Sequence, residues 1–413
     1  MNPISACRSC GAGPLELVLG LGNTPLANAL QPAEARPDAS PEARFPLDLV
    51  VCHHCSLAQI TATVPPEVMF RDYPYFSSYS ETTLQHARRS AESLVRDRGL
   101  GPQSLVVEIA SNDGYLLQYF QEAGVPILGI EPAENVAATA RKRGIPTVVE
   151  FFGKELASKL KAEGRRADLI LANNVMAHVP DVNGVVAGVA ELLKPGGAFV
   201  METPYVGDML DKVEFDTIYH EHLFYYSLTA LEALLRRHGL AAERVDRVAI
   251  HGGSLRVRAV PETELGPRPT VDRLLIEEAN GVASPDHFRD FAGRVERLRR
   301  ELLSLLRGLR AEGKRLAAYG AAAKGSTLLN AFGIGPDLIE FVVDRSPHKQ
   351  GRRMPGVGLP IHSPGKLLEE MPDAVLLLTW NFADEILEQQ TEYLRRGGRF
   401  LIPVPTPRVV GPS

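Results

Sequence analysis

The hydrophobic pattern divides the chain into stretches of different character. From Leu105 onward, short apolar runs alternate with helical segments, and the runs end in polar or glycine-containing turns. Buried strands are predicted over residues 105–114, 125–130, 167–173 and 197–202. A helix is predicted to follow the first strand. Strands that alternate with helices are typical of an α/β sheet.

A second unit of this kind begins near Arg315. Residues 315–327 predict a strand, a glycine turn and a helix, and later strands are predicted over residues 339–344, 374–380 and 400–403. The chain therefore predicts two Rossmann-like α/β units in succession.

The segments outside these units are less regular. A helix is predicted over residues 82–98, before the first unit. Between the units, His251–Arg258 is predicted to be an edge strand with a glycine-rich entry, and the polar region from there to about Phe288 is predicted to be a linker. Residues 288–313 carry leucines at helical spacing among many charges, which predicts a connecting helix packed on one face.

Length and composition set the broad class. At 413 residues the chain is too long for one core and predicts two or three domains. Its 45% apolar content, 23% charged content and net charge of −5 give no electrostatic reason to expect nucleic acid or an anionic membrane as a partner. No signal-peptide pattern and no apolar run of about 20 residues is present, so a cytoplasmic protein is expected.

All four cysteines lie before residue 56, in two C-x-x-C pairs: Cys7, Cys10, Cys52 and Cys55. Each pair can form one knuckle of a tetrahedral zinc site with four thiolate ligands. The alternatives are a redox dithiol, four unrelated thiols, or a zinc site in which His53 or His54 replaces a cysteine ligand. A closed four-cysteine site leaves no open position for catalysis, so we expect this zinc to be structural.

A polar strand end and an acidic residue after the next strand indicate a nucleoside site. Glu131 follows the strand over 125–130, about twenty residues after the first turn, where Rossmann-type sites bind ribose hydroxyls. The loop Glu108–Gly114 lacks the three glycines that let a pyrophosphate approach a helix N-terminus. Because acidic groups occupy that place, S-adenosylmethionine fits better than NAD. An α/β domain without a ligand is the alternative.

Two aromatic and polar stretches flank this region. Arg71–Glu81, with three tyrosines and several hydroxyls before a helix, suits either a loop that covers a ligand or a linker packed on the next domain. His178 follows the strand over 167–173, at the edge where open α/β sheets bind ligands. We expect it in the site rather than in the core.

The stretch Asp216–Ser227 packs two histidines, two carboxylates and three tyrosines into twelve residues. It could form a metal site, an acid and base cluster, or a polar strand. Because the stretch follows the strand over 197–202, we expect it to fold over the same edge of the sheet as His178. The cysteine site removes the need for a metal here, which favours acid and base chemistry, with His220 as a bystander.

In the second unit, small residues after Tyr319 allow a close approach of backbone to a phosphate, which Lys324 could neutralise. Asp344 falls at the end of the second strand, about 24 residues after Gly320, and the loop beginning at Trp380 should lie at the same edge. A nucleotide or sugar nucleotide is expected. A degenerate Rossmann repeat used only for packing is the alternative.

Taken in order, these features resemble the family of nucleotide-sugar C-methyltransferases. The resemblance covers essentially the whole chain, and its most specific segments are the four cysteines and the residues 75–80, 108–114, 173–180, 219–222 and 319–325. It implies an α/β protein with a zinc-binding domain (1–70), a class I S-adenosylmethionine-dependent methyltransferase domain (71–247), a connecting strand and helices (248–312) and a C-terminal Rossmann-like domain that helps to hold a nucleotide diphosphate (313–413).

The resemblance also implies a set of site residues. His222 matches the proposed general base, oriented by Glu221, with Tyr219, His178 and one N-terminal tyrosine (Tyr73, Tyr75 or Tyr79, with Tyr73 preferred) in the sugar site. The residues implied for the cofactor are Phe76, Ser77, Ser78, Glu108, Ala110, Asn112, Asp113, Gly114, Glu131, Asn173 and Asn174. Those implied for the nucleotide sugar are Tyr319, Gly320, Ala321, Lys324, Asp344 and Asn381.

The implied reaction is transfer of a methyl group to a carbon beside the ketone of a nucleotide-linked 4-keto-deoxysugar. Such a carbon is a weak acid, so a base must remove its proton while a donor stabilises the enolate oxygen. The alternatives are methylation of oxygen or nitrogen in a related small molecule, a zinc protein that binds a nucleotide sugar without turnover, and a nicotinamide oxidoreductase.

Overall fold

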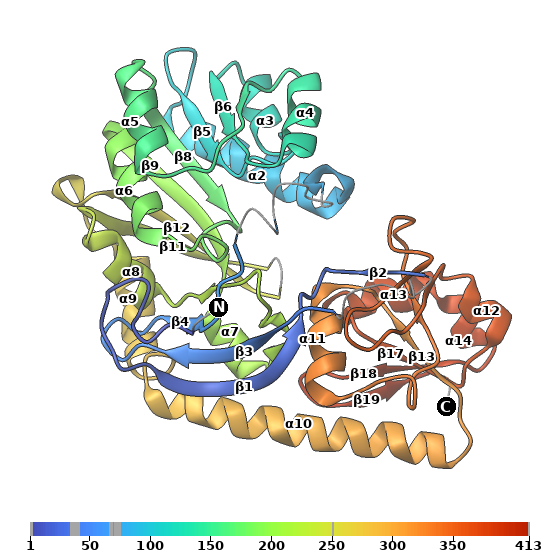
Figure 1. Cartoon of the computed structure of the whole chain (residues 1–413). Helices are drawn as coiled ribbons and strands as arrows, with labels where there is room; N and C mark the ends of the chain where they lie inside the picture. The colour runs from blue at the N-terminus through green and yellow to red at the C-terminus, as the bar shows by residue number, and fades with distance from the viewer. Residues whose placement is uncertain (1–2, 34–41, 66–68, 70–75, 250–251, 412–413) are drawn as a thin grey trace.

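The computed structural model describes residues 3–33, 42–65, 69, 76–249 and 252–411. In these ranges the chain forms three sheets and one two-stranded ribbon, with helices packed around the two larger sheets (Figure 1). No helix in them combines the length and the apolar character needed to cross a lipid bilayer.

The first sheet is antiparallel and joins two distant parts of the chain. Its strands, in spatial order, are β1 (Glu16–Pro25), β3 (Arg44–Val51), β4 (Ala58–Ile60) and β10 (Phe224–Tyr225). Strand β10 belongs to the stretch Asp216–Ser227 and pairs with β4, Phe224 facing Gln59. The N-terminal sheet is therefore completed by the segment that carries the candidate base.

The seven-stranded sheet has the order β11-β12-β9-β8-β5-β6-β7, and β12 runs antiparallel to both of its neighbours. The central strands β5 and β6 are buried at every position, as expected for strands covered on both faces. The strands are β5 (Val106–Ile109), β6 (Ile127–Ile130), β7 (Thr147–Val148), β8 (Ala167–Asn173), β9 (Leu193–Pro204), β11 (Leu240–Val248) and β12 (Ser254–Pro261). These bounds confirm the predicted α/β fold.

Helices cover both faces of this sheet. The core beside Val106 contains buried residues of α2, α3 and α4, whereas the core beside Val107 contains those of α5, α6 and α8. The helices of this unit are α2 (Glu81–Arg98), α3 (Leu117–Glu122), α4 (Glu134–Lys142), α5 (Lys154–Ala162), α6 (Val182–Leu192), α7 (Val206–Asp211) and α8 (Leu228–Arg236).

Two predictions for the region after residue 247 are wrong. The segment predicted as an edge strand becomes β12, which lies between β9 and β11 inside the sheet. The polar region predicted as a linker contains the short 3-10 turn η3 (Glu262–Glu264) and helix α9 (Pro269–Ala279). The charged residues of α9 led to the prediction of an exposed linker. One of them, Glu278, is instead buried and accepts hydrogen bonds from the start of α8.

The six-stranded sheet has the order β16-β14-β13-β17-β18-β19, parallel except for β19 at its edge. Its strands are β13 (Leu316–Tyr319), β14 (Val342–Val343), β16 (Ile361–His362), β17 (Ala374–Leu377), β18 (Arg399–Ile402) and β19 (Arg408–Val410). The helices around it are α11 (Ala323–Phe332), α12 (Lys366–Glu370), α13 (Ala383–Gln389) and α14 (Thr391–Arg395).

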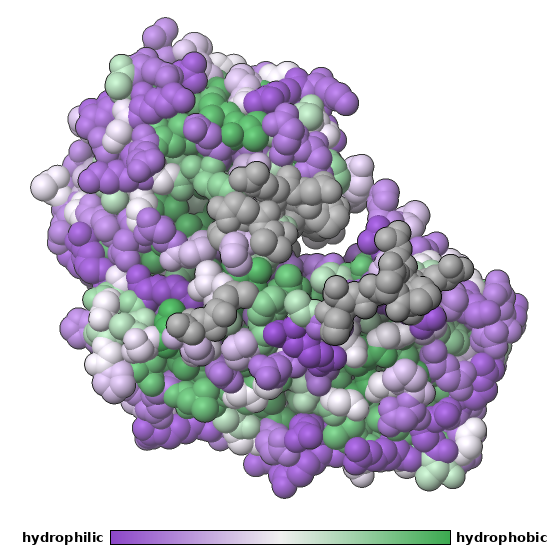
Figure 2. Space-filling view, viewed as in Figure 1, coloured by the Kyte–Doolittle hydropathy of each residue, from purple (hydrophilic) through white to green (hydrophobic). Residues whose placement is uncertain are grey.

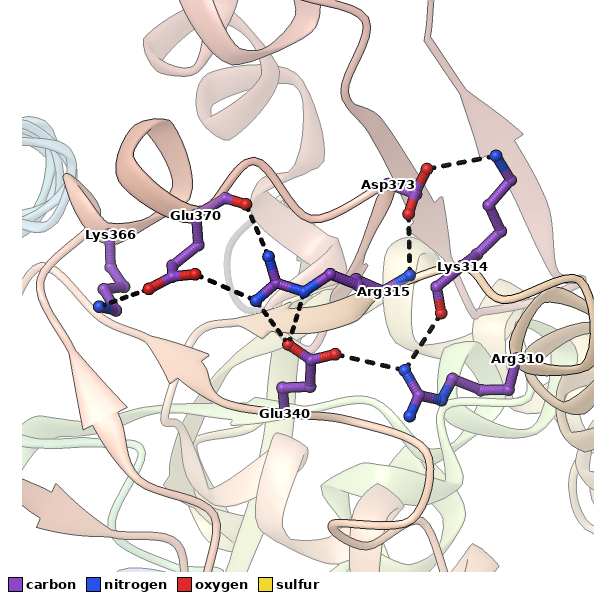
Figure 3. A network of polar contacts seen from close by, with 7 residues as sticks. All are labelled: Arg310, Lys314, Arg315, Glu340, Lys366, Glu370 and Asp373. Carbon is purple, nitrogen blue, oxygen red and sulfur yellow. Dashed lines mark hydrogen bonds and ion pairs between the residues drawn. The ribbon is translucent and has the colours of Figure 1, made fainter.

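Helix α10 (Pro285–Ala311) runs along the molecule past both the N-terminal strands and the six-stranded sheet (Figure 1). At its end, Arg310 Nη1 donates to Glu340 Oε1 (3.3 Å), and Arg315 contacts Glu340 (2.8 Å) and Glu370 (3.1 Å). Lys366 and Asp373 extend this network of partly exposed charges (Figure 3). The network fixes the junction between α10 and β13.

A second contact joins the N-terminal region to the six-stranded sheet. Strand β2 (Gln31–Pro32) pairs with β15 (Arg352–Arg353) to form the ribbon. The Gly356 N–H also donates to Glu42 Oε2 (2.8 Å). Figure 2 shows the surface hollowed between the lobe of the seven-stranded sheet and the lobe of the six-stranded sheet. The N-terminal strands pair with both parts of the chain, β4 with β10 and β2 with β15.

We predict that Glu278→Gln destabilises the fold. The Glu278 carboxylate accepts hydrogen bonds from Leu228 N, Thr229 N and Thr229 Oγ1 at 2.6–2.7 Å, and an amide cannot accept on its nitrogen. A loss of about 2 kcal/mol is expected for charge-assisted bonds, which lowers the thermal unfolding midpoint by roughly 4–8 °C. Circular dichroism melting checks this. Glu277→Gln, on the exposed side of α9, is the control and should melt within about 1 °C of the parent; equal melting of both variants would contradict the prediction.

Candidate active site

The four cysteines lie together, as predicted. Their sulfur atoms are all within 4.8 Å of one another, with 3.7 Å between the Sγ atoms of Cys7 and Cys55 and 3.6 Å between those of Cys10 and Cys52. Four thiolates about 2.3 Å from one tetrahedral ion would be about 3.8 Å apart, so the cluster fits zinc. Gln59 Nε2 donates to Cys7 Sγ (3.2 Å) and orients this ligand.

The neighbouring histidines take other roles. His53 is exposed and contacts Glu16 Oε2 at 2.5 Å, and His54 is also exposed. Neither belongs to the cluster of potential ligands. The four cysteines therefore complete a tetrahedral ligand set without a histidine.

The loop after β5 is tightly turned and docks on the residue that follows β6. Ala110, Asn112 and Gly114 have positive φ angles, and a Cβ on Gly114 would lie 2.7 Å from Ile145 Cγ1. Glu131 Oε2 accepts from Asn112 N (2.9 Å), and its Oε1 accepts from Ala133 N (2.9 Å). The acidic residue and the loop thus meet as the sequence predicts, with lone pairs of the carboxylate left for a ligand.

Buried polar atoms gather around this loop. Glu108 Oε2, Ser111 Oγ, Asp113 Oδ1 and Asn173 Oδ1 have no hydrogen-bond partner among the described residues. Burial, together with Glu131 and Asp113, raises the pKa of Glu108 well above its ordinary value. Unpaired acceptors beside an acidic loop fit a polar ligand with cationic character.

The covering loop ends on the same turn. The 3-10 turn η1 (Ser77–Tyr79) follows Phe76, and Ser77 N donates to Asn112 Oδ1 (2.9 Å). Ser78 Oγ donates to Asp113 Oδ2, which also accepts from Arg143 Nη1 (3.1 Å). Residues 71–75 lie outside the described residues, and these contacts fit both a loop that covers a ligand and a linker packed on the next domain. Arg143, on the turn after α4, is a contributor that the sequence pattern did not reveal.

Of the three candidate tyrosines in this stretch, Tyr79 is among the described residues. Tyr73 and Tyr75 lie outside the described residues. Tyr79 is 76% exposed and its ring stacks on Phe76, with 5.4 Å between the centroids. Tyr79 therefore does not enter the buried part of the site.

The loop after β8 brings a histidine to the catalytic stretch. Asn174 has a positive φ angle, and its N–H donates to Glu202 O (2.8 Å) on β9. The His178 ring lies 4.9 Å from the His222 ring, measured between centroids, at an interplanar angle of 71°. Burial lowers the pKa of His178 to about 4, so its imidazole is neutral near pH 7. The expected meeting of these two loops is present in the structure.

The stretch Asp216–Ser227 is buried except for a few side chains. Tyr219, Glu221 and His222 are half-buried, whereas the run Leu223–Leu228 is buried. Leu223 N donates to Ala177 O (2.7 Å), and Tyr226 OH donates to Met176 O (3.0 Å). The segment is thus fixed to the loop after β8 and leaves these three polar side chains accessible.

Two hydrogen bonds define the state of His222. Its Nδ1 lies 3.0 Å from Thr217 O, and since a carbonyl can only accept, Nδ1 carries the proton. Its Nε2 is then the lone-pair nitrogen, and it lies 2.9 Å from Tyr219 OH, which donates to it. A neutral imidazole with one nitrogen tied to backbone and the other facing a phenol is suited to accept a proton.

The prediction that Glu221 orients His222 is wrong. Glu221 Oε1 accepts from Asn28 Nδ2 (2.6 Å), a residue of the N-terminal region, and Thr217 orients the imidazole instead. Burial raises the pKa of Glu221. Residues 219–222 form a turn in which His222 N donates to Tyr219 O (2.9 Å), and this turn directs Glu221 toward Asn28 and His222 toward Thr217. The 3-10 turn η2 (Phe215–Thr217) precedes it.

His220 is a structural residue of the N-terminal contact. Its Nε2 donates to Pro46 O (3.2 Å), and its ring meets Phe45 edge to face. Burial lowers the pKa of this imidazole.

In the C-terminal unit, the strand-end loops also meet as predicted. Ala321 N donates to Asp344 Oδ2 (2.7 Å), and Gly320 has a φ of 99°. A Cβ on Gly320 would lie 2.5 Å from the Thr379 side chain, which requires glycine here. Tyr319 is buried in the core beside Phe400, so its side chain serves packing. Asn381 lies on η4 (Trp380–Phe382) after β17, at the same edge.

Lys324 lies beside Trp380, and its role at a phosphate stays a prediction. Its Nζ is buried 4.7 Å from the centroid of the Trp380 ring and has no hydrogen-bond partner among the described residues. The nearby carboxyls Glu214 and Asp216 have pKa values raised by burial to about 7 and about 6, and the Lys324 ammonium opposes that rise. Lys324 therefore belongs to a charged cluster between the two units.

Family models cover the chain in three consecutive parts. A zinc binding domain matches residues 7–70, a methyltransferase domain matches residues 83–245, and a C-methyltransferase C-terminal domain matches residues 249–405. C-methyltransferase NovU of Streptomyces niveus is 40% identical over 412 residues, which are 99% of this chain and 98% of that protein. The chain belongs to this family of C-methyltransferases. It is an S-adenosylmethionine-dependent methyltransferase with a zinc-binding domain.

Other proteins match a smaller share of the chain. A ubiquinone biosynthesis O-methyltransferase of Methylobacterium nodulans is 28% identical over 145 residues, 34% of this chain and 55% of that protein. Among solved structures, magnesium protoporphyrin IX methyltransferase of Synechocystis with bound S-adenosylmethionine is 15% identical. The match covers 43% of the present chain and 78% of the solved chain, with a TM-score of 0.34.

We predict that Cys52→Ser empties the zinc site of the methyltransferase. Three thiolates hold zinc less tightly than four, and Cys52 and Cys55 lie on the turn that joins β3 to β4, so both the metal content and the thermal unfolding midpoint should fall. Mass spectrometric metal analysis of the purified protein should drop from about one zinc per chain to a small fraction of that.

The matched control is His54→Ala, in the same knuckle. It should keep its zinc, because the cluster of potential ligands contains the four cysteines without this histidine. Full zinc content in Cys52→Ser, or zinc loss in His54→Ala, would show that the ligand set is different.

Proposed function

We propose that the enzyme transfers a methyl group to a carbon beside the ketone of a nucleotide-linked 4-keto-deoxysugar, through an enolate formed by His222. The observation that carries this proposal is the state of His222, whose Nδ1 is tied to Thr217 O while Nε2 faces the accessible Tyr219 hydroxyl. The similarity to a protein named as a C-methyltransferase supports carbon as the acceptor atom.

The residues around His222 suit proton removal from carbon. In the first step, His222 Nε2 removes the proton from the carbon beside the ketone. The electrons of the broken C–H bond form a carbon–carbon double bond to the carbonyl carbon, and the electrons of the C=O double bond move to the oxygen, which becomes negatively charged. The Thr217 carbonyl, which holds Nδ1–H, then stabilises the imidazolium.

Tyr219 and His178 are placed to stabilise the oxygen. Once substrate separates the Tyr219 hydroxyl from Nε2, this hydroxyl can donate to the enolate oxygen. His178 stays neutral because burial depresses its pKa, and it can donate an N–H without competing for the proton. Glu221, held by Asn28, is left to contact the sugar.

The acidic loop over Glu108–Gly114 and Glu131 is suited to S-adenosylmethionine, which supplies an electrophilic methyl on a sulfonium centre when bound. The residues implied for it are those on the two strand ends, β5 and β8, and on the covering loop at Ser77 and Ser78. Asn173 and Asn174 adjoin the loop that carries His178, and the His178 ring lies 4.9 Å from the His222 ring, which supports a cofactor site next to the candidate base.

The nucleotide is expected at the strand ends of the C-terminal unit. Gly320 permits a close approach of the backbone, and Asp344 fixes the loop through Ala321 N. Thr327 Oγ1 donates to Ile218 O (3.2 Å), so this unit sits directly on the segment that carries His222. A nucleotide held there would present its sugar toward the candidate base.

We predict that His222→Ala abolishes exchange of solvent deuterium into the carbon beside the ketone of a 4-keto nucleotide sugar. Removal of the general base should slow this exchange by roughly 10²–10⁴-fold. Binding of S-adenosylmethionine, measured by calorimetry, should be unchanged, because the substituted position lies outside the loop over 108–114.

Proton NMR follows the exchange in the absence of methyl donor. His348→Ala, at a histidine of the C-terminal unit, is a control for the loss of an imidazole and should exchange at the parent rate. Undiminished exchange in His222→Ala would rule out His222 as the base.

We also predict where the methyl group appears. A 4-keto nucleotide sugar incubated with the enzyme and S-adenosylmethionine should gain one methyl group, bonded to a ring carbon adjacent to the ketone. Mass spectrometry detects the gain, and carbon–proton correlation NMR locates it. A methyl group on oxygen or nitrogen would contradict carbon transfer, and no gain with any 4-keto sugar would contradict the acceptor class.

A further inference from the structure

The tautomer of His222 depends on one backbone carbonyl. With Nδ1–H donated to Thr217 O, the lone pair is on Nε2 and faces Tyr219. In the other tautomer the lone pair would be on Nδ1, turned toward the backbone, and Nε2 could not accept a proton. The position of Thr217 O therefore decides whether the imidazole can act as a base.

The residues on both sides of Thr217 are held by the C-terminal unit. Asp216 Oδ2 accepts from Trp380 Nε1 at 2.7 Å. Ile218 O accepts from Thr327 Oγ1 at 3.2 Å, and the Phe215 ring stacks on Phe332 of α11 with 4.5 Å between the centroids. Three contacts from α11 and η4 thus fix the turn η2 from outside its own domain.

The indole of Trp380 is itself fixed. The Lys324 ammonium lies 4.7 Å from the centroid of its ring, and the buried carboxyls Glu214 and Asp216 share the neighbourhood of that cation. The Asp216 side chain is fully buried, so its hydrogen bond with the indole is shielded from water. The cluster is therefore a rigid support rather than a surface ion pair.

Trp380 also stands at the edge where the nucleotide is expected. It begins η4 directly after Thr379, and Thr379 occupies the space beside Gly320. Leu378 N donates to Tyr319 O (2.9 Å), which joins the end of β17 to the end of β13. The same short loop therefore borders the candidate nucleotide site and supports η2.

We propose that Trp380 and Asp216 are positioning residues through which the C-terminal unit fixes the Nδ1–H tautomer of His222. This inference rests on the proposed function, since it concerns the base assigned there. The C-terminal unit then contributes to proton transfer as well as to nucleotide binding. Its contribution is indirect, since Trp380 contacts Asp216, next to Thr217, and does not contact the reacting atoms.

The test is nitrogen NMR of the imidazole side chains in enzyme labelled with ¹⁵N-histidine. The signal of His222 among the 11 histidines is assigned by its absence from His222→Gln. In the parent, nearly all of the His222 signal should be Nδ1–H. Trp380→Phe keeps an aromatic face for Lys324 and removes the N–H donor to Asp216. In this variant the fraction of His222 in the Nδ1–H tautomer should fall to about half, because the hydrogen bond from Nδ1–H to Thr217 O is no longer held in place.

Two further variants complete the design. Thr327→Val removes the hydroxyl that holds Ile218 O at nearly constant volume, and it should shift the tautomer in the same direction; it decides the question if Trp380→Phe does not fold. Tyr225→Phe is the matched control. Its hydroxyl donates to Thr217 O (3.3 Å) from the methyltransferase domain, and removing it leaves this carbonyl free to accept from His222 Nδ1–H. The Nδ1–H share should stay at the parent value in this control.

An unchanged Nδ1–H share in both Trp380→Phe and Thr327→Val overturns the inference, as does an equal shift in Tyr225→Phe. The measurement needs no substrate, so its result is independent of the acceptor. A shifted tautomer together with no methylation of any 4-keto sugar supports the positioning role and contradicts the proposed function.

Discussion

The structure depends on a single constraint, which is the placement of the segment between Phe215 and Tyr226 against three different parts of the chain. Its end pairs with β4 beside the cysteine cluster, its middle bonds to the loop after β8, and its beginning packs on α11. Most residues of the segment are buried. The accessible polar side chains among them are thereby held in one arrangement, since no part of the segment can move without breaking a contact with a different unit.

Much of the fold could be predicted from the sequence because its determinants are local. The run Ala167–Asn173 is mainly apolar and bounded by polar residues, and it forms β8 with those bounds. The paired cysteine knuckles needed only their spacing to indicate a zinc site. Helix α10 followed from the spacing of its leucines. The strand and helix patterns report on nearby residues alone, and the cysteine pairs, 42 positions apart from Cys10 to Cys52, are linked by their shared affinity for one ion.

The wrong predictions concern contacts between distant residues. The charge of Glu278 argued for an exposed linker, but that carboxylate is buried under the start of α8. Glu221 was expected to orient the neighbouring imidazole, whereas its partner Asn28 is 193 positions away in the chain. Trp380 gave no sign of its bond to Asp216 for the same reason. A linear pattern cannot show which distant element supplies a partner for a buried polar group.

The pairing of β10 with β4 also bears on how the protein is made. The cysteine-rich region is synthesised before the strand that completes its sheet, which lies beyond the parallel core of the methyltransferase domain. Domains usually fold as they emerge, from the N-terminus onward. Here the first sheet has an open edge at β4 until residue 225 has been synthesised. All four potential zinc ligands precede β4 in the chain, so the ligand set is complete in the sequence long before the strand that completes the sheet.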